Sequence, residues 1–280
     1  MVVEGSMINA LRRGLPKEVP WTLGGSIQAV VLNCLRVPRP VERRLAQRFI
    51  EDIKDAGDGL LAVRLKAQED KLYFPDDLPR TALFQTLVEQ LYSWHWHYYQ
   101  IPQTRVEADD VVFDCGCAEG VFAFLTRRRA ARIHAFEPLP TFLKGLRRTF
   151  ADSRNVEIVP CALAESPGSA YLHEAGISSS ITSEPTATPV VIESIDHYCA
   201  QHNARMSFLK ADLEGYEMNV LRGAAETIRA NKPRVAITTY HRKDHALEIA
   251  KWLKSLNPGY RMMIKGICRL NGSPIMLHAW

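Results

Sequence analysis

The sequence predicts an α/β protein in which helices cover both faces of a doubly wound, mostly parallel sheet. From Val106 onward, short runs rich in β-branched and aromatic residues alternate with segments whose apolar residues recur at helical spacing. The last two such runs flank a dipeptide suited to a hairpin turn, whereas the residues before Val106 follow a helical pattern. We therefore expect an α/β domain over 106–280 that ends in an antiparallel hairpin, preceded by an N-terminal helical cap or subdomain over 1–105.

The individual elements of this sheet follow from the alternation. Strands are expected at 111–115, 132–136, 156–160, 207–212 and 234–240, and helices at 121–129, 141–150, 217–230 and 246–256. Two further apolar runs, 260–266 and 274–280, flank Asn271-Gly272, which favours a two-residue hairpin. The hairpin would add an antiparallel strand, a feature that ordinary dinucleotide-binding sheets lack.

Two apolar stripes at helical spacing predict the helices of the cap. The first consists of Leu45, Phe49, Ile50 and Ile53, and the second of Leu83, Phe84, Leu87, Val88 and Leu91. The aromatic stretch 94–99, which contains two histidines, is expected to pack the cap against the main domain. A place in a substrate pocket is the alternative for this stretch.

Composition limits the class of protein. The chain has 280 residues, a formal net charge of +4 and six cysteines without metal-site or disulfide spacing. Its longest apolar run, 27–35, is far shorter than the roughly 20 residues of a membrane span. We therefore expect a cytoplasmic protein with reduced thiols and no membrane span, and a homo-oligomer is an open alternative. The mild charge and the lack of an RNA-binding module argue against nucleic acid as a partner.

A glycine-rich turn and an acidic residue together predict a nucleoside site. The turn at 114–120 (DCGCAEG) follows a strand and opens a helix, where Gly116 and Gly120 permit close approach of a ligand. Glu137 ends the next strand, where a carboxylate can accept hydrogen bonds from both ribose hydroxyls. Because the turn lacks the full GxGxxG of pyrophosphate-binding loops, S-adenosylmethionine fits it better than a nicotinamide dinucleotide.

Two further strand ends carry polar residues that should face the same crevice. Asp212 and Glu214 lie in KADLEGYE (210–217) after the fourth strand, and His241 ends the fifth. The alternatives are that Glu217 only favours a helix N-terminus by its charge, and that His241 is a surface residue.

Four stretches in this order resemble the FkbM family of S-adenosylmethionine-dependent methyltransferases. They are DCGCAEG (114–120), AFEP (135–138), NVEIVPCAL (155–163) and KADLEGYE (210–217), the last followed by VLRGA (220–224). The resemblance implies a class I methyltransferase fold, which is Rossmann-like, and methylation of hydroxyl groups, often on sugars or natural products.

The resemblance also implies a cofactor site. Its residues would be Asp114, Gly116, Cys117, Glu119 and Gly120 around the methionine, Glu137 and Pro138 at the ribose, Cys161 and Ala162 beside the adenine, and Asp212 near the methyl group. Cys117 stands where the family more often has a small residue such as alanine, and it could make cofactor binding sensitive to oxidation.

Methyl transfer to a hydroxyl needs alignment of acceptor, methyl and sulfur, and removal of a proton. We expect His241 to act as the base and Asp212 to orient it or share the role. Glu214, Ser179, Ser180 and His241 are expected to contact the acceptor. The Ser-, Thr- and Pro-rich stretch 174–189 is either a flap over the crevice or a surface loop. Asp212, Glu214 and His241 could also gather a divalent metal, but their spacing does not establish a site, and no metal is expected.

The expected function is therefore transfer of a methyl group to a hydroxyl of a small molecule, glycan or natural-product intermediate. The alternatives are methylation of nitrogen or RNA, and a non-catalytic binding or assembly protein that retains the fold. Binding of S-adenosylmethionine without turnover over a broad set of acceptors would favour the non-catalytic alternative. Binding of a nicotinamide cofactor would instead indicate a dehydrogenase.

Overall fold

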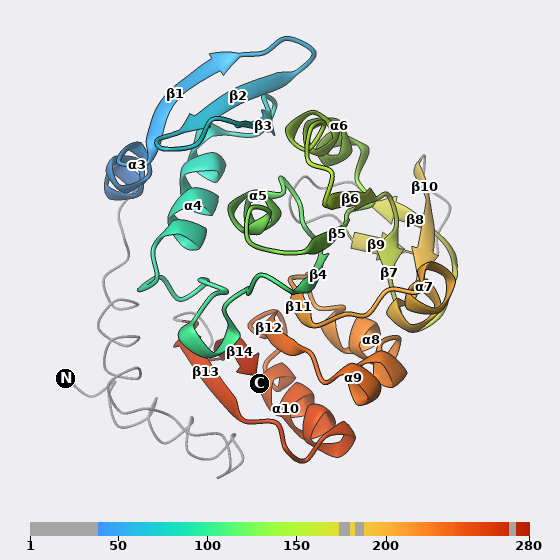
Figure 1. Cartoon of the computed structure of the whole chain (residues 1–280). Coiled ribbons are helices and arrows are strands. Elements are labelled where there is room, and N and C mark those ends of the chain that lie inside the picture. The colour runs from blue at the N-terminus through green and yellow to red at the C-terminus, as the bar shows by residue number, and fades with distance from the viewer. Residues whose placement is uncertain (1–38, 174–179, 183–187, 269–272) are drawn as a thin grey trace, which may run out of the picture.

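The computed structural model describes residues 39–173, 180–182, 188–268 and 273–280 (Figure 1). Ser179 and the Asn271-Gly272 turn lie outside these residues, as does most of the stretch 174–189. Within the described residues, no helix has the length and apolar character needed to cross a membrane.

The main sheet has seven strands in the order β13-β14-β12-β11-β4-β5-β6. β12, β11, β4, β5 and β6 are parallel, while β14 runs antiparallel to both of its neighbours, β12 and β13. The predicted parallel sheet and its antiparallel C-terminal pair are confirmed. The strands are β4 (Val111–Cys115), β5 (Arg132–Phe136), β6 (Val156–Val159), β11 (Phe208–Ala211), β12 (Arg234–Thr238), β13 (Met262–Ile267) and β14 (Pro274–Ala279).

Helices cover both faces of this sheet (Figure 1). One hydrophobic cluster includes the apolar sides of α5 and α6, and another includes those of α7 to α10. The predicted helix 217–230 is divided into α8 and α9 at Gly223, where an added Cβ would lie 2.2 Å from the carbonyl oxygen of Ala164. The helices are α5 (Val121–Thr126), α6 (Pro140–Thr149), α7 (Ile195–His202), α8 (Glu217–Arg222), α9 (Ala225–Asn231) and α10 (His245–Leu256).

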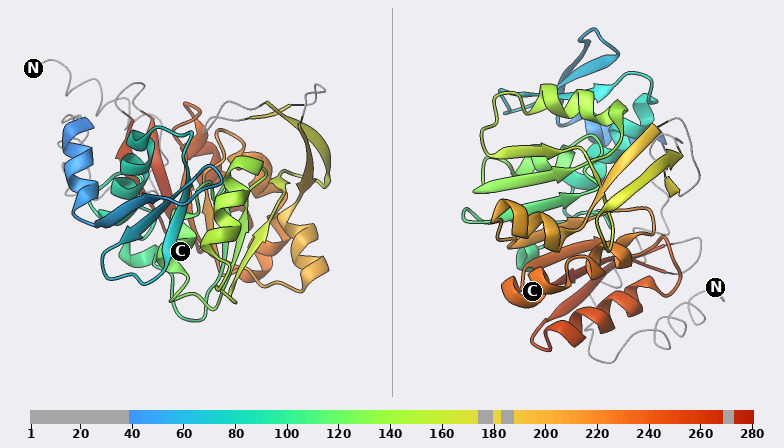
Figure 2. Two further views of the ribbon diagram at one scale, coloured as in Figure 1. Left: turned by 90° about the horizontal axis from the view of Figure 1, so that it is seen from above. Right: turned by 90° about the vertical axis from the view of Figure 1, so that its right-hand side faces the viewer.

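A second sheet of four strands, which the sequence analysis did not predict, lies between β6 and α7 in the chain. Its order is β7-β10-β8-β9, and Figure 2 shows its yellow strands beside the main sheet. The described parts of 174–189 are strands of this sheet and not a loop. Its strands are β7 (Ala162–Leu163), β8 (Gly168–His173), β9 (Ser180–Thr182) and β10 (Thr188–Glu193).

The N-terminal segment is only partly helical, so the prediction of a helical cap is wrong for residues 50–75. Three strands form an antiparallel sheet there, in the order β1-β2-β3. Gly57, Asp58 and Gly59 all have positive φ angles, of 71°, 57° and 72°, which no helix can include, so the chain reverses at this point. The elements are α3 (Arg39–Gln47), β1 (Ile50–Asp55), β2 (Leu60–Leu65), β3 (Lys71–Pro75), α4 (Arg80–Leu91) and the short 3₁₀ helix η1 (Pro102–Thr104).

The N-terminal segment packs closely against the main sheet's helices. Leu72 of β3 and Leu87 of α4 belong to the same hydrophobic cluster as Phe122 and Leu146 of α5 and α6. At Gly145 of α6, an added Cβ would lie 2.6 Å from a backbone oxygen of β3. This packing brings α4 to the edge of the sheet at which the parallel strands end. The division into two domains near Val106 stays a prediction.

Candidate active site

A pocket of about 280 Å³ opens at the carboxyl ends of β4, β5 and β11. It is lined by residues at these strand ends, by residues of α6 and β7, and by residues of α4 and the stretch that follows it. Most of the residues expected to bind cofactor line it: Gly116, Cys117, Glu119, Glu137, Pro138, Cys161, Ala162 and Asp212, together with the expected acceptor contact Glu214. Parallel strands that end at one edge bring these distant motifs together.

The turn after β4 is shaped by residues in the left-handed region. Gly116, Ala118 and Gly120 have φ angles of 68°, 47° and 76°. A Cβ at Gly116 would lie 2.1 Å from the carbonyl oxygen of Asp212, so the first and last motifs pack directly on each other. Gly120 does not line the pocket; it caps α5, and its close neighbour is Leu146 of α6.

A buried ion pair between Asp114 and Lys210 stabilises this turn. Asp114 is fully buried and does not line the pocket, and its Oδ1 lies 3.0 Å from Nζ of Lys210. The same ammonium group donates a 2.6 Å hydrogen bond to the carbonyl oxygen of Gly116. Burial lowers the pKa of Lys210, but Asp114 and Asp212 outweigh burial and raise it, so the lysine stays charged. Lys210 was not predicted as a site residue. Its position two residues before Asp212, within the motif KADLEGYE, is the signal that could have identified it.

Glu137 connects the motifs at 114–120 and 135–138. Its Oε2 accepts a 2.9 Å hydrogen bond from the backbone N–H of Ala118, and its Oε1 accepts one of the same length from Leu139. Burial raises the pKa of Glu137 to about 7, and burial raises that of Glu119 to about 7 as well. Burial also raises the pKa of the Cys117 thiol, which keeps it protonated and works against the expected sensitivity to oxidation.

The aromatic stretch 94–99 reaches the pocket, in line with the alternative stated for it. Trp96, His97 and Tyr99 line the pocket, and His97 and Tyr99 both contact Asp212. No local pattern predicts this contact, because 115 positions separate His97 from Asp212.

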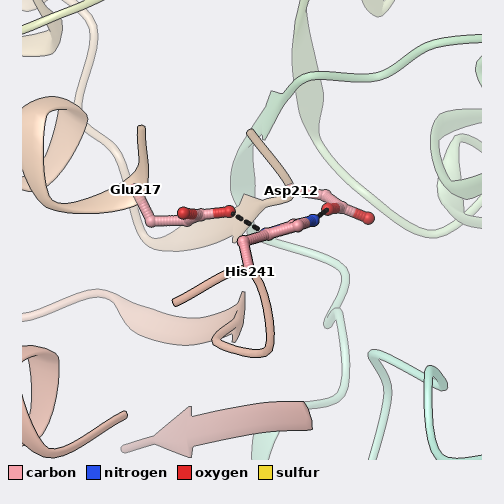
Figure 3. A group of neighbouring side chains, drawn as sticks. All are labelled: Asp212, Glu217 and His241. Atoms are coloured by element: carbon pink, nitrogen blue, oxygen red, sulfur yellow. Dashed lines mark hydrogen bonds and ion pairs between the residues drawn. The ribbon is translucent and has the colours of Figure 1, made fainter. Parts of the chain in front are cut away.

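His241 does not line the pocket. It lies next to Asp212 and Glu214, which form the acidic edge of the pocket. Its Nδ1 is 2.8 Å from Oε1 of Glu217, and its Nε2 is 3.9 Å from Oδ1 of Asp212 (Figure 3). The same Nε2 lies 3.4 Å from Oε2 of Glu214. Burial lowers the pKa of His241, but the hydrogen bond and charge of Glu217 outweigh burial and raise it. Glu217 is fully buried and also accepts a hydrogen bond from Thr238, so it does more than favour a helix N-terminus.

Asp212, Glu217 and His241 each offer one ligand atom, and these atoms lie within 4.8 Å of one another, which is close enough to hold a metal ion. The carboxylate of Glu217 and Nδ1 of His241 are, however, engaged with each other. Of the remaining predicted acceptor contacts, Ser180 belongs to β9, and Ser179 lies outside the described residues.

The strand order of the main sheet, with one antiparallel strand between β12 and β13, defines a class I methyltransferase fold. The family model described as the methyltransferase FkbM domain matches residues 114–262, more than half of the chain. The chain belongs to this family of methyltransferases.

Solved structures resemble the chain at low sequence identity. The methyltransferase FkbM from Methylobacillus flagellatus is 20% identical with a TM-score of 0.49, and the match covers 86% of this chain and 58% of that protein. The chain thus spans less than two thirds of that relative's length. An rRNA methylase from Streptococcus thermophilus is 14% identical with a TM-score of 0.39, and the match covers 62% of this chain and 87% of the methylase. Fibrillarin from Aeropyrum pernix, solved with natively bound S-adenosyl-L-methionine, is 13% identical with a TM-score of 0.37, and the match covers 82% and 99% of the two chains. The comparison with curated proteins finds no match.

Proposed function

We propose that the protein transfers the methyl group of S-adenosylmethionine to a hydroxyl group of a small molecule, a glycan or a natural-product intermediate. The observation that carries the proposal is that Gly116, Glu137 and Asp212, from three different strand ends, line one pocket. The family match supports methyl transfer as the reaction.

The cofactor half of the pocket fits a nucleoside with an amino acid tail. Gly116 lines the pocket without a side chain, and the place that its Cβ would take is filled by the carbonyl oxygen of Asp212, so the turn and the Asp212 motif form one continuous surface for the cofactor. Each carboxylate oxygen of Glu137 accepts one backbone hydrogen bond and retains a lone pair for a ribose hydroxyl. Cys161 and Ala162 lie along the same pocket as an apolar surface for the adenine. S-adenosylmethionine bound here would supply the sulfonium methyl group.

The part of the pocket lined by Asp212 and Glu214 is the proposed acceptor site. When Nδ1 of His241 donates its proton to Glu217, Nε2 is left as an acceptor on the side of Asp212 and Glu214. This tautomer suits a general base. Because His241 does not line the pocket, the acceptor's proton would reach Nε2 through Glu214, whose Oε2 lies 3.4 Å from it. Glu214 and Asp212 line the pocket and would hydrogen-bond the acceptor hydroxyl.

Calorimetric titration with S-adenosylmethionine, S-adenosylhomocysteine and NADH tests the cofactor assignment. We expect roughly micromolar dissociation constants for the first two ligands and no binding of NADH. An absence of binding by either adenosyl compound would contradict the assignment.

A panel of sugars, polyols, phenols and amines, with transfer followed by mass spectrometry, tests the acceptor. Methylation of amines alone would contradict the hydroxyl assignment, and cofactor binding without any transfer would favour a non-catalytic role. The proposal requires no metal ion, so turnover should survive EDTA; activity lost on EDTA and restored by Mg²⁺ would overturn that part.

A further inference from the structure

His97 lies in the pocket although it precedes the region matched by the family model. Both of its ring nitrogens face carboxylates: Nδ1 is 3.3 Å from Oε2 of Glu89 on α4, and Nε2 is 3.0 Å from Oδ2 of Asp212. A neutral imidazole carries one N–H, so one of these nitrogens would direct a lone pair at a negative oxygen. Only the doubly protonated ring satisfies both contacts.

The surroundings of His97 favour such a cation. The Trp96 ring stacks on it with centroids 4.9 Å apart and an interplanar angle of 8°, and the Tyr240 ring stands edge-on at 5.9 Å. Aromatic faces stabilise cations that are removed from water. The other polar groups that face it are the Tyr99 hydroxyl, 2.9 Å from Nε2, and His95, whose Nδ1 accepts a hydrogen bond from the backbone N–H of His97. Burial lowers the pKa of His97, but Glu89 and Asp212 outweigh burial and raise it to about 10.

His97 and Tyr99 together fix one carboxylate oxygen of Asp212. Its Oδ2 accepts hydrogen bonds from His97 and from the Tyr99 hydroxyl, the latter 2.8 Å long. Its Oδ1 lies 3.1 Å from the Thr238 hydroxyl, whose single proton it shares with Oε1 of Glu217, and it faces His241. Burial raises the pKa of Asp212, but the hydrogen bond and charge of His97 outweigh burial and bring it below its usual value, so Asp212 remains an anion. A carboxylate held in this way is a poor proton acceptor, which leaves that role to His241.

We propose that His97 is a positioning residue of the methyl-transfer site, a fixed imidazolium that holds Asp212 as an anion with Oδ1 turned toward His241 and the acceptor. The catalytic part of this inference rests on the proposed function. It assigns to the N-terminal segment a role in the reaction that the FkbM-matched residues do not supply by themselves.

Nuclear magnetic resonance of the protein labelled with ¹⁵N-histidine and ¹³Cγ-aspartate tests the charge state directly. At about pH 8.5, where ordinary histidines are neutral, we expect the His97 ring to have both nitrogens protonated. That signal should be absent in His97→Gln, persist in His202→Gln as an exposed control, and lose its proton at lower pH in Glu89→Gln. One aspartate carboxyl should titrate at higher pH in His97→Gln than in the unchanged protein.

A spectrum of the unchanged protein without any imidazolium at that pH would overturn the inference even if His97→Gln fails to fold. A folded His97→Gln that retains every imidazolium signal of the unchanged protein would overturn it as well. With an acceptor from the panel, His97→Gln should bind S-adenosylmethionine within about threefold of the unchanged protein and turn over at least roughly tenfold more slowly. Equal turnover would overturn the catalytic role. Failure of the unchanged protein to bind S-adenosylmethionine would instead refute the proposed function and leave the spectra valid.

Discussion

Cofactor affinity should depend on Glu137 more than on any other single residue of the pocket. We expect Glu137→Gln to weaken S-adenosylmethionine binding by about 1.5 to 3 kcal/mol for each charge-assisted bond lost, or at least about tenfold in Kd. Because the pKa of Glu137 is about 7, the loss should be larger at about pH 8, where the group is ionised, than at about pH 6. Calorimetry at both pH values measures it.

Glu157→Gln is the matched control for this change, since Glu157 lies on β6, pairs with Arg132 and does not line the pocket. Equal affinities for Glu137→Gln and Glu157→Gln would remove Glu137 from the cofactor site.

His241 should make turnover depend on pH in a direction set by Glu217. As the base, His241 must be neutral, and Glu217 raises its pKa, so the rate should increase as the pH rises through a value above 6.5. Glu217→Gln removes the charge that favours the imidazolium, so the rising limb should move to lower pH. His241→Ala should reduce turnover by roughly 10² to 10⁴. Profiles of rate against pH test this; an unmoved limb in Glu217→Gln would exclude the pair as the titrating unit.

At the scale of single residues, the pocket-lining residues that could be predicted from the sequence are those that belong to contiguous motifs. Gly116, Glu137 and Asp212 follow strands whose ends meet, so their meeting in one pocket required only the topology. His97 and Glu89 could not be predicted as partners of Asp212, because their contact depends on how α4 packs against the sheet. Local patterns carry no information about such packing.

At the scale of elements, the strands of the main sheet were predictable because they are short, mostly apolar runs that alternate with segments of helical spacing. The second sheet was missed partly because β7 has two residues and β9 three, too few for a period to be visible. β8 begins with Gly168 and β10 has Pro189 at its second position, and both residue types are typical of turns. The N-terminal strands were missed for another reason. Ile50 and Ile53 are spaced as on a helix, yet they belong to β1, and the glycines at 57 and 59 turn the chain into β2.

The turn after β4 yields a prediction at this scale. Gly116→Ala should destabilise the protein by roughly 2 kcal/mol or more, because its Cβ would clash with the carbonyl oxygen of Asp212 and its φ angle is positive. Gly168→Ala is the control, because an added Cβ there meets nothing within 4 Å. Urea unfolding of the two variants should separate them clearly. Equal stabilities would mean that the turn relaxes without cost.

At the scale of the whole molecule, the N-terminal segment and the methyltransferase sheet behave as one packed body. Leu72 on β3 is fully buried in the cluster that also contains residues of α5 and α6. Leu72→Ala should therefore lower the free energy of unfolding of the entire molecule by about 2 to 5 kcal/mol, as Leu209→Ala on β11 should. A single thermal transition, shifted in both variants, is expected in calorimetry. A separate, early transition in Leu72→Ala alone would show that the segment unfolds independently.

The position of β14 makes it the only connection between β13 and the rest of the main sheet among the described strands. β13 pairs with β14 and with no other described strand, while β14 pairs with β12. The hydrogen bonds that join β13 to the sheet therefore all pass through the strand that follows it in the chain. Any change that detaches β14 from β12 releases both strands together.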